Sequence, residues 1–172
     1  REALAACTED PAGSTLYVTL EPCCHQGRQP PCVDAVLDAG IRRVVVGTTD
    51  PNPLVGGKGI ARLQERGVEV TVGMLEEECR TLNRFFFHYI RTRRHYVVMK
   101  YAMTMDGKIA ACTGDAKWIT GEAAREHVHR LRHRCRGILV GVGTVLADDP
   151  MLNCRLPGGR DPVRVICDSH LR

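Results

Sequence analysis

The sequence predicts an α/β protein in which short parallel strands alternate with helices. Short apolar runs recur along the first half of the chain, and turn residues bound each of them. Segments with helical spacing separate these runs, which is typical of a parallel sheet covered on both faces. The composition, 44% hydrophobic and 26% charged, is that of a soluble globular protein, and no apolar run is long enough to cross a membrane.

The first half supplies its elements in a regular order. Pro31 suits the first turn of a helix, and Gly40 and Gly67 stand where helices are expected to end. The expected elements are strand 16–20, a helix after Pro31, strand 43–47, helix 60–66, strand 68–72 and an amphipathic helix over 76–90. The apolar stripe of that last helix, interpreted as core or inter-domain packing, consists of Leu82, Phe85, Phe86 and Tyr89.

A short basic segment, 91–95, is the expected linker between two domains, 1–92 and 95–172. We interpret its arginines as a solvated hinge in preference to a nucleic-acid patch, because runs of charge are usually solvated surface. The elements expected beyond it are a strand from Tyr96, a turn at Asp106–Gly107, a helix over 121–135, a strand from Ile138 that gives way to a short helix, and a strand over 163–166.

The helix over 121–135 is rich in arginine and histidine. His129 and His133 stand four residues apart and could share a metal ion, but a charged helix face is the more common reason for such a spacing. One or two of the arginines could hold a phosphate, because the guanidinium fork matches phosphate oxygens. The formal net charge, +4, suits an anionic small molecule as well as it suits nucleic acid.

The stretch 20–32, LEPCCHQGRQPPC, has the most distinctive chemistry in the chain. Thiolates beside the first turn of a helix are stabilised by its dipole, and zinc prefers such ligands. Cys23 and Cys32 are therefore the predicted zinc ligands, with Cys24 and His25 as alternatives. The competing interpretation is that the cysteines are mostly core residues, since two thiolates make only half of a tetrahedral site.

This stretch, together with DPNPLVGGKG at 50–59, resembles the deaminase motif of the bifunctional deaminase/reductase family of riboflavin biosynthesis. The resemblance implies a cytidine-deaminase-like three-layer domain with zinc on Cys23 and Cys32. In that family an H-A-E triplet stands immediately before a segment like Arg1–Leu4 and supplies the third ligand and the catalytic glutamate. We therefore expect no catalytic acid or base within this sequence, which resembles the middle of a longer enzyme truncated at both ends.

The segments 100–108, 118–120 and 143–150 resemble the reductase half of the same family. The resemblance implies the first part of a dihydrofolate-reductase-like α/β domain that uses NADPH. Carried over motif by motif, the cofactor positions are Ala102, Trp118, Thr144 and Asp148, and the substrate positions are Ala116, Arg132, Leu152 and Arg155. The two arginines suit the ribose phosphate of the family's substrate.

The resemblance implies zinc-dependent hydrolytic deamination of a diaminopyrimidinone ribosylamino phosphate and NADPH-dependent reduction of its ribosyl group. It also implies a cytoplasmic homo-oligomer that binds a phosphorylated pyrimidine and neither nucleic acid nor membrane. Two alternatives stay open. The chain could be a deaminase acting on another nucleoside or RNA, or a catalytically incomplete fragment with a structural zinc or none. Without the triplet, we expect little or no deaminase turnover.

Overall fold

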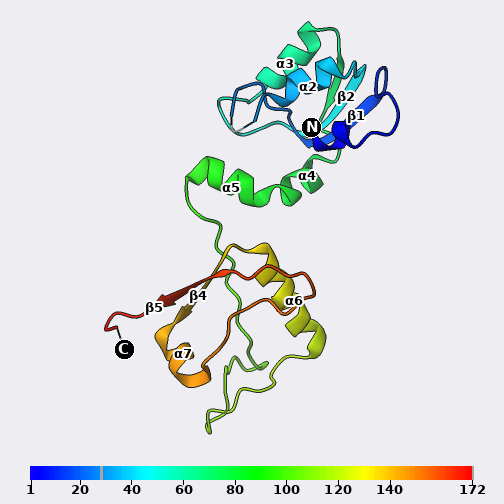
Figure 1. Cartoon of the computed structure of the whole chain (residues 1–172). Coiled ribbons are helices and arrows are strands. Elements are labelled where there is room, and N and C mark those ends of the chain that lie inside the picture. Colours follow the sequence, from blue (N-terminus) through cyan, green and yellow to red (C-terminus); the bar gives the residue numbers. More distant parts are fainter. Residues whose placement is uncertain (28, 172) are drawn as a thin grey trace. The chain divides into compact units, whose positions relative to one another are not determined.

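The computed structural model describes residues 1–27 and 29–171, which divide into two compact units, Arg1–Val98 and Met99–Arg172. Figure 1 shows strands and helices alternating through the first unit, whereas a long irregular stretch precedes α6 in the second. The first unit contains α1 (Glu2–Ala5), β1 (Thr15–Leu20), α2 (Cys32–Asp38), β2 (Arg43–Thr48), α3 (Lys58–Glu65), β3 (Glu69–Val72), α4 (Glu76–Leu82) and α5 (Arg84–Thr92). The second contains α6 (Glu122–Arg134), β4 (Gly137–Gly141), α7 (Val142–Asp148) and β5 (Val163–Cys167).

Strands β1, β2 and β3 form a parallel sheet with β2 in the centre. Val44 of β2 is paired in register with Leu16 of β1 and with Val70 of β3. All three strands therefore end at the same edge of the sheet, and the loops that leave this edge lie close together. In parallel sheets that edge is where ligands usually bind.

Helices cover both faces of this sheet because β2 is apolar on both. Val44 and Val46 are fully buried and pack with Leu63 of α3 and with residues of α2. The next residue along, Gly47, points to the opposite face, where an added Cβ would collide with the Sγ of Cys79 in α4. The first unit is thus a three-layer arrangement of helices, sheet and helix.

The amphipathic helix predicted over 76–90 is two helices in the structure, α4 and α5, which meet at Asn83. The side-chain amide of Asn83 donates to the carbonyl of Cys79 at 2.8 Å and so competes with the backbone ladder. The predicted apolar stripe is correspondingly wrong in part. Leu82 and Tyr89 are exposed, whereas Phe87, which the spacing did not single out, is buried.

In the second unit, β4 and β5 form a parallel pair from Gly137↔Val163 to Gly141↔Cys167. The strand predicted from Tyr96 does not form in the part of the chain that the structure describes, because no described segment pairs with it. The predicted turn does form, with Gly107 at a φ of 81° and the N–H of Thr104 donating to the carbonyl of Lys108. Among the described residues, no helix has the length and apolar character needed to span a bilayer.

Candidate metal and substrate sites

Two cysteines predicted to bind metal come together where β1 ends and α2 begins. Cys32 is the first residue of α2, and its backbone N–H donates to the Sγ of Cys23 at 3.4 Å. The N–H of Val33 donates to the carbonyl of Cys23 at 3.1 Å, which closes the loop a second time. The N-terminus of α2 therefore faces the Cys23 sulfur.

The ionisation of the Cys32 thiol depends on its burial and on Cys23. Burial raises the pKa of the Cys32 thiol, and its hydrogen bond and charge interaction with Cys23 raise that pKa further. The start of α1 lies beside this pair, because the guanidinium of Arg1 donates to the carbonyl of Pro31, the residue before Cys32, at 3.4 Å.

The residues present fit a zinc ion in part. Cys23 and Cys32 are soft ligands on one side of a half-buried space, as zinc requires. Within residues 1–27 and 29–171, no third His, Cys, Asp or Glu completes a ligand cluster with them. Of the two alternatives, Cys24 turns its Sγ to the carbonyl of Leu54, and the Nδ1 of His25 is buried without a hydrogen-bond partner.

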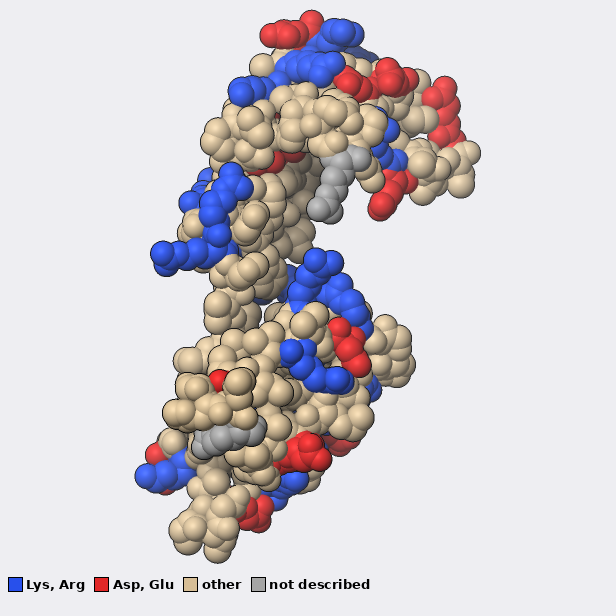
Figure 2. All heavy atoms as spheres, turned by 60° about the vertical axis from the view of Figure 1, so that its left-hand side comes forward, with Lys and Arg blue, Asp and Glu red and all other residues tan. Residues whose placement is uncertain are grey.

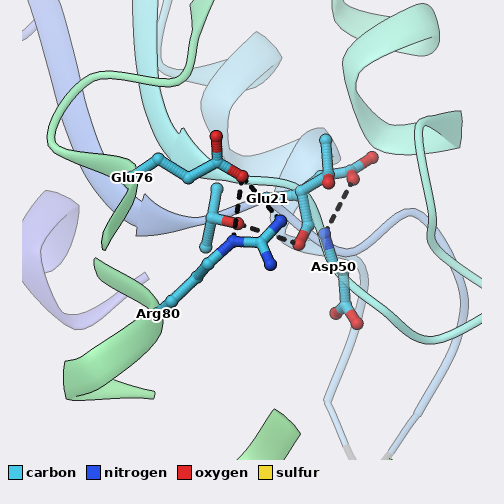
Figure 3. Close-up of polar contacts among 6 residues, drawn as sticks. Glu21, Asp50, Glu76 and Arg80 are labelled. Carbon is cyan, nitrogen blue, oxygen red and sulfur yellow. Dashed lines mark hydrogen bonds and ion pairs between the residues drawn. The ribbon is translucent and has the colours of Figure 1, made fainter. Parts of the chain in front are cut away.

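Glu21 lies at the same edge of the sheet, and sequence reasoning assigned it no role. Its side chain is 3% exposed and accepts backbone N–H groups from Asp50 (3.2 Å) and Gly57 (2.9 Å) on Oε2 and from Gly59 (3.0 Å) and Ile60 (3.3 Å) on Oε1. Figure 3 shows the bond from the Asp50 backbone to the Glu21 carboxylate. The only sequence features that could have indicated this role are the acidic residue before Pro-Cys and the glycine-rich start of α3.

Asp50 follows β2 and brings a second carboxyl group to this edge. Its residue is 8% exposed, and its carboxylate accepts the N–H of Asn52 at 2.8 Å. Burial raises the pKa of Asp50, the Asn52 hydrogen bond opposes that shift, and the charge of Glu21 adds to it. His25 lowers the pKa of Asp50, so the imidazole lies near this carboxyl group. Thiol, imidazole and carboxyl groups therefore share one edge of the sheet.

In the second unit, the segment after α7 folds back onto α6. Arg132 donates to the carbonyl of Asn153 at 2.8 Å, and the N–H of Arg155 donates to Nδ1 of His129 at 3.2 Å. Leu152 is buried. Burial lowers the pKa of Arg132, and the nearby charge of Arg155 lowers it further. Three of the four predicted substrate residues, Arg132, Leu152 and Arg155, thus occupy one region.

Two histidines of α6, His129 and His133, hold that segment in place. His129 accepts from Arg155 as above, and Nδ1 of His133 accepts the N–H of Arg160 at 3.0 Å. Arg160 also donates from its guanidinium to the carbonyl of His133 at 3.1 Å. The four-residue spacing of the two histidines is therefore explained by the backbone N–H groups that their rings accept.

The other predicted residues of this unit lie in two places. Ala116 and Trp118 line one pocket together with Thr104, Asp106 and Lys108. Thr144 and Asp148 stand four residues apart on α7 and are exposed on the same side of it, whereas Ala102 is half-buried in the irregular stretch. Nothing in the described contacts joins the pocket to the α7 pair.

Sequence reasoning missed a residue that contacts Trp118. The guanidinium of Arg125 lies 4.5 Å from the ring centroid of Trp118 and donates to the carbonyl of Thr120 at 2.6 Å. Trp118 is 69% exposed, so the guanidinium is a main support for the indole ring on that side. An arginine early in a charged helix carries no sequence signal for such a contact.

Two family profiles match the chain. The cytidine and deoxycytidylate deaminase zinc-binding region matches residues 1–48, and the RibD C-terminal domain matches residues 95–172. These matches confirm the predicted fold class, a cytidine-deaminase-like α/β domain followed by part of a dihydrofolate-reductase-like α/β domain.

Curated relatives and solved structures agree. The riboflavin biosynthesis protein RibD of Actinobacillus pleuropneumoniae is 59% identical over 172 residues, which is 100% of this chain and 46% of that protein. RibD of Escherichia coli K12 is 41% identical over 183 residues, 99% of this chain and 50% of the relative. The Thermotoga maritima diaminohydroxyphosphoribosylaminopyrimidine deaminase/5-amino-6-(5-phosphoribosylamino)uracil reductase has a TM-score of 0.88 and 50% identity, covering 97% of this chain and 47% of its own. The chain therefore spans about half the length of these proteins.

Proposed function

Because this chain belongs to the RibD family of riboflavin biosynthesis proteins, we propose that its two units carry parts of a zinc-dependent deaminase and of an NADPH-dependent reductase. The observation that carries the deaminase proposal is the Cys23–Cys32 pair at the start of α2. It stands at the carboxyl edge of a parallel sheet, within the region that matches a deaminase zinc-binding family. The proposed domains are 1–92 and 95–172.

Cys23 and Cys32 are the proposed zinc ligands of this chain. Zinc, when bound, supplies Lewis-acid activation of water for hydrolysis of an amino group. The family pattern places a third ligand and a proton-shuttling glutamate in a triplet next to Arg1, and the contact of the Arg1 guanidinium with the carbonyl of Pro31, the residue before Cys32, supports that placement. The chain's own contribution is to hold the two thiol groups next to each other at the first turn of α2.

We propose that the pyrimidine lies over the polar groups at the same edge. His25 has a buried Nδ1 without a partner, and Asp50 is a buried carboxyl group whose pKa is raised by burial. Both groups can form hydrogen bonds with the amino and carbonyl groups of a diaminopyrimidinone ring. Burial of these groups excludes water and strengthens such bonds.

In the second unit, Arg132 and Arg155 are the proposed ligands for the substrate phosphate. The nearby charge of Arg155 lowers the pKa of Arg132, and an anion between the two guanidinium groups would relieve that repulsion. Leu152 and Ala116 complete the proposed substrate contacts. NADPH, when bound, supplies the reducing equivalents. The proposed cofactor contacts are Ala102, Trp118, Thr144 and Asp148.

A deaminase of another branch, acting on a nucleoside or on RNA, is less well supported. Residues 95–172 match a RibD C-terminal domain, which such a reading leaves unexplained. On the face shown in Figure 2, the described Lys and Arg residues of each unit form separate groups interspersed with Asp and Glu. We propose a phosphorylated pyrimidine as the partner, a cytoplasmic location, and a homo-oligomer as the assembly.

Two assays test the proposal on this chain. Titration with NADPH, followed by its own fluorescence, should show saturable binding if the reductase assignment is right. Incubation with the phosphorylated diaminopyrimidinone should release little or no ammonia, because no third metal ligand joins Cys23 and Cys32 among the described residues. Absence of NADPH binding would argue against the reductase assignment, and rapid ammonia release would show that the catalytic groups lie within this sequence.

A further inference from the structure

The carboxylate of Glu21 joins three parts of the first unit. Its own N–H donates to the carbonyl of Thr48 at the end of β2, at 3.0 Å. Its Oε2 holds the N–H groups of Asp50 and Gly57, and its Oε1 holds those of Gly59 and Ile60. Glu21 therefore ties the end of β1 to the loop after β2 and to the first turn of α3.

The backbone is closely packed around this carboxylate. The carbonyl oxygen of Pro22 lies against Gly59 so closely that an added Cβ would overlap it. That Cβ would also lie 3.2 Å from Oε1 of Glu21. The backbone at Pro22 is thus packed against α3. The next residue, Cys23, is held by α2, because its Sγ accepts the N–H of Cys32.

Stability alone does not explain why a buried carboxylate with four backbone N–H donors stands at this position. Taking a carboxylate out of water is costly, and the four donors offset that cost only while both loops keep their positions. An apolar side chain could fill the same space without this demand. Unlike an apolar side chain, the carboxylate also fixes the orientation of the peptide that precedes Cys23.

We propose that Glu21 is a positioning residue for the metal half-site, which presents the Cys23 sulfur to the Cys32 sulfur before a metal ion arrives. This inference rests on the proposed zinc function of the thiol pair. Ligands held in place by surrounding hydrogen bonds bind metal more tightly, since less freedom is lost on binding. Glu21 acts through Pro22 and Cys23 and does not itself contact the metal.

Cobalt(II) is the probe that tests this, because its bonds to thiolates absorb in the near ultraviolet and its visible bands report geometry. The variant is Glu21→Gln, which keeps the size of the side chain and replaces one acceptor oxygen by a donor. We expect the cobalt affinity to fall about tenfold or more, and the visible bands to change, because the sulfurs no longer hold one geometry. Far-ultraviolet circular dichroism establishes that the variant is folded.

Glu76→Gln is the matched control. This substitution makes the same chemical change in the same unit. The carboxylate of Glu76, however, is paired with Arg80 within α4, as Figure 3 shows. Its cobalt affinity and spectrum should equal those of the wild type. If Glu21→Gln does not fold, Glu21→Asp carries the test, because it keeps the charge and shortens the side chain by one methylene. A smaller loss in the same direction is then expected.

A folded Glu21 variant that binds cobalt within twofold of the wild type, with unchanged bands, would overturn the inference. A lower melting temperature with unchanged cobalt binding would do the same, since it would make Glu21 a stabilising residue only. Failure of the wild-type chain to bind cobalt at all is a different result. It would remove the proposed metal site itself, and the role of Glu21 with it.

Discussion

The backbone N–H of Cys32 lies 3.4 Å from the Sγ of Cys23, so the first turn of α2 is joined to the thiol that follows β1. Two residues that are nine apart in the sequence thereby become neighbours at the carboxyl edge of the sheet. The same edge holds Glu21, which fixes the peptide before Cys23, and Asp50, which follows β2. The geometry of the proposed metal site therefore depends on where β1 and β2 end and where α3 begins.

Substitution of Gly59 by alanine should destabilise the first unit by about 1–3 kcal/mol, because overpacking forces backbone shifts. The added Cβ would overlap the carbonyl oxygen of Pro22. Chemical denaturation followed by circular dichroism measures the effect. Gly143→Ala is the control, since nothing lies within 4 Å of its Cβ position and the change favours the helix. Equal stability of Gly59→Ala and wild type would contradict the close packing at this point.

Acidification should weaken the second unit through His129. Burial lowers the pKa of His129 below 6.5, and the charges of Arg155 and Arg132 lower it further. The unfolded chain then binds a proton more readily than the folded one. Stability is therefore fully present above pH 6.5 and is lost as the pH falls from there toward the folded pKa. Protonated Nδ1 can no longer accept the N–H of Arg155.

Thermal unfolding at about pH 7.5 and about pH 5.5 measures this dependence. His129→Gln removes the titrating group while its amide oxygen can still accept a hydrogen bond, so the variant should be less sensitive to acid. His127→Gln, on the same helix, is the matched control. An acid sensitivity that is the same in His129→Gln as in the wild type would assign the effect to other groups.

Arg132→Lys should weaken binding of a ribose phosphate about tenfold, because an ammonium group cannot reproduce the fork of the guanidinium. Arg132 is held in place by its bond to the carbonyl of Asn153 at 2.8 Å. Calorimetric titration with ribose 5-phosphate measures the affinity. Arg130→Lys is the control, because Arg130 is exposed and paired with Glu126 on the same helix. Equal losses in both variants would indicate a general effect of charge.

Trp118 is the single tryptophan of the chain, so tryptophan emission reports on its surroundings alone. Binding of NADPH beside it should quench that emission. Arg125→Ala removes the guanidinium 4.5 Å from the ring and should lower the NADPH affinity by about two- to fivefold. A fluorescence titration measures both effects. NADPH binding that leaves the emission of Trp118 unchanged would place the cofactor elsewhere.

Much of the fold follows from local patterns. The valines of β2 and the glycines after the helices predict strands and helix ends, and the structure contains them. The break at Asn83 was missed, because an amide that bonds the carbonyl four residues earlier does not disturb the apolar periodicity. The strand expected from Tyr96 depends on a partner strand, which a pattern within one segment cannot supply.

The candidate site is divided in the same way. Cys23 and Cys32 were singled out because zinc chemistry requires thiolates and the prolines indicate helix starts. Glu21 was missed, because its role depends on N–H groups 29 to 39 residues further along the chain. Arg125 was missed for a similar reason, since its contact with Trp118 depends on how the irregular stretch folds.

Zinc content tests the central claim most directly. Elemental analysis of freshly purified protein of confirmed mass should find zinc bound to the wild-type chain, and Cys23→Ser or Cys32→Ser should lose it, because each variant removes one of two thiolates. Cys7→Ser, which changes an exposed cysteine outside the pair, should retain the wild-type content. A folded wild-type chain without zinc, or zinc that survives both substitutions, would contradict the assignment of Cys23 and Cys32 as metal ligands.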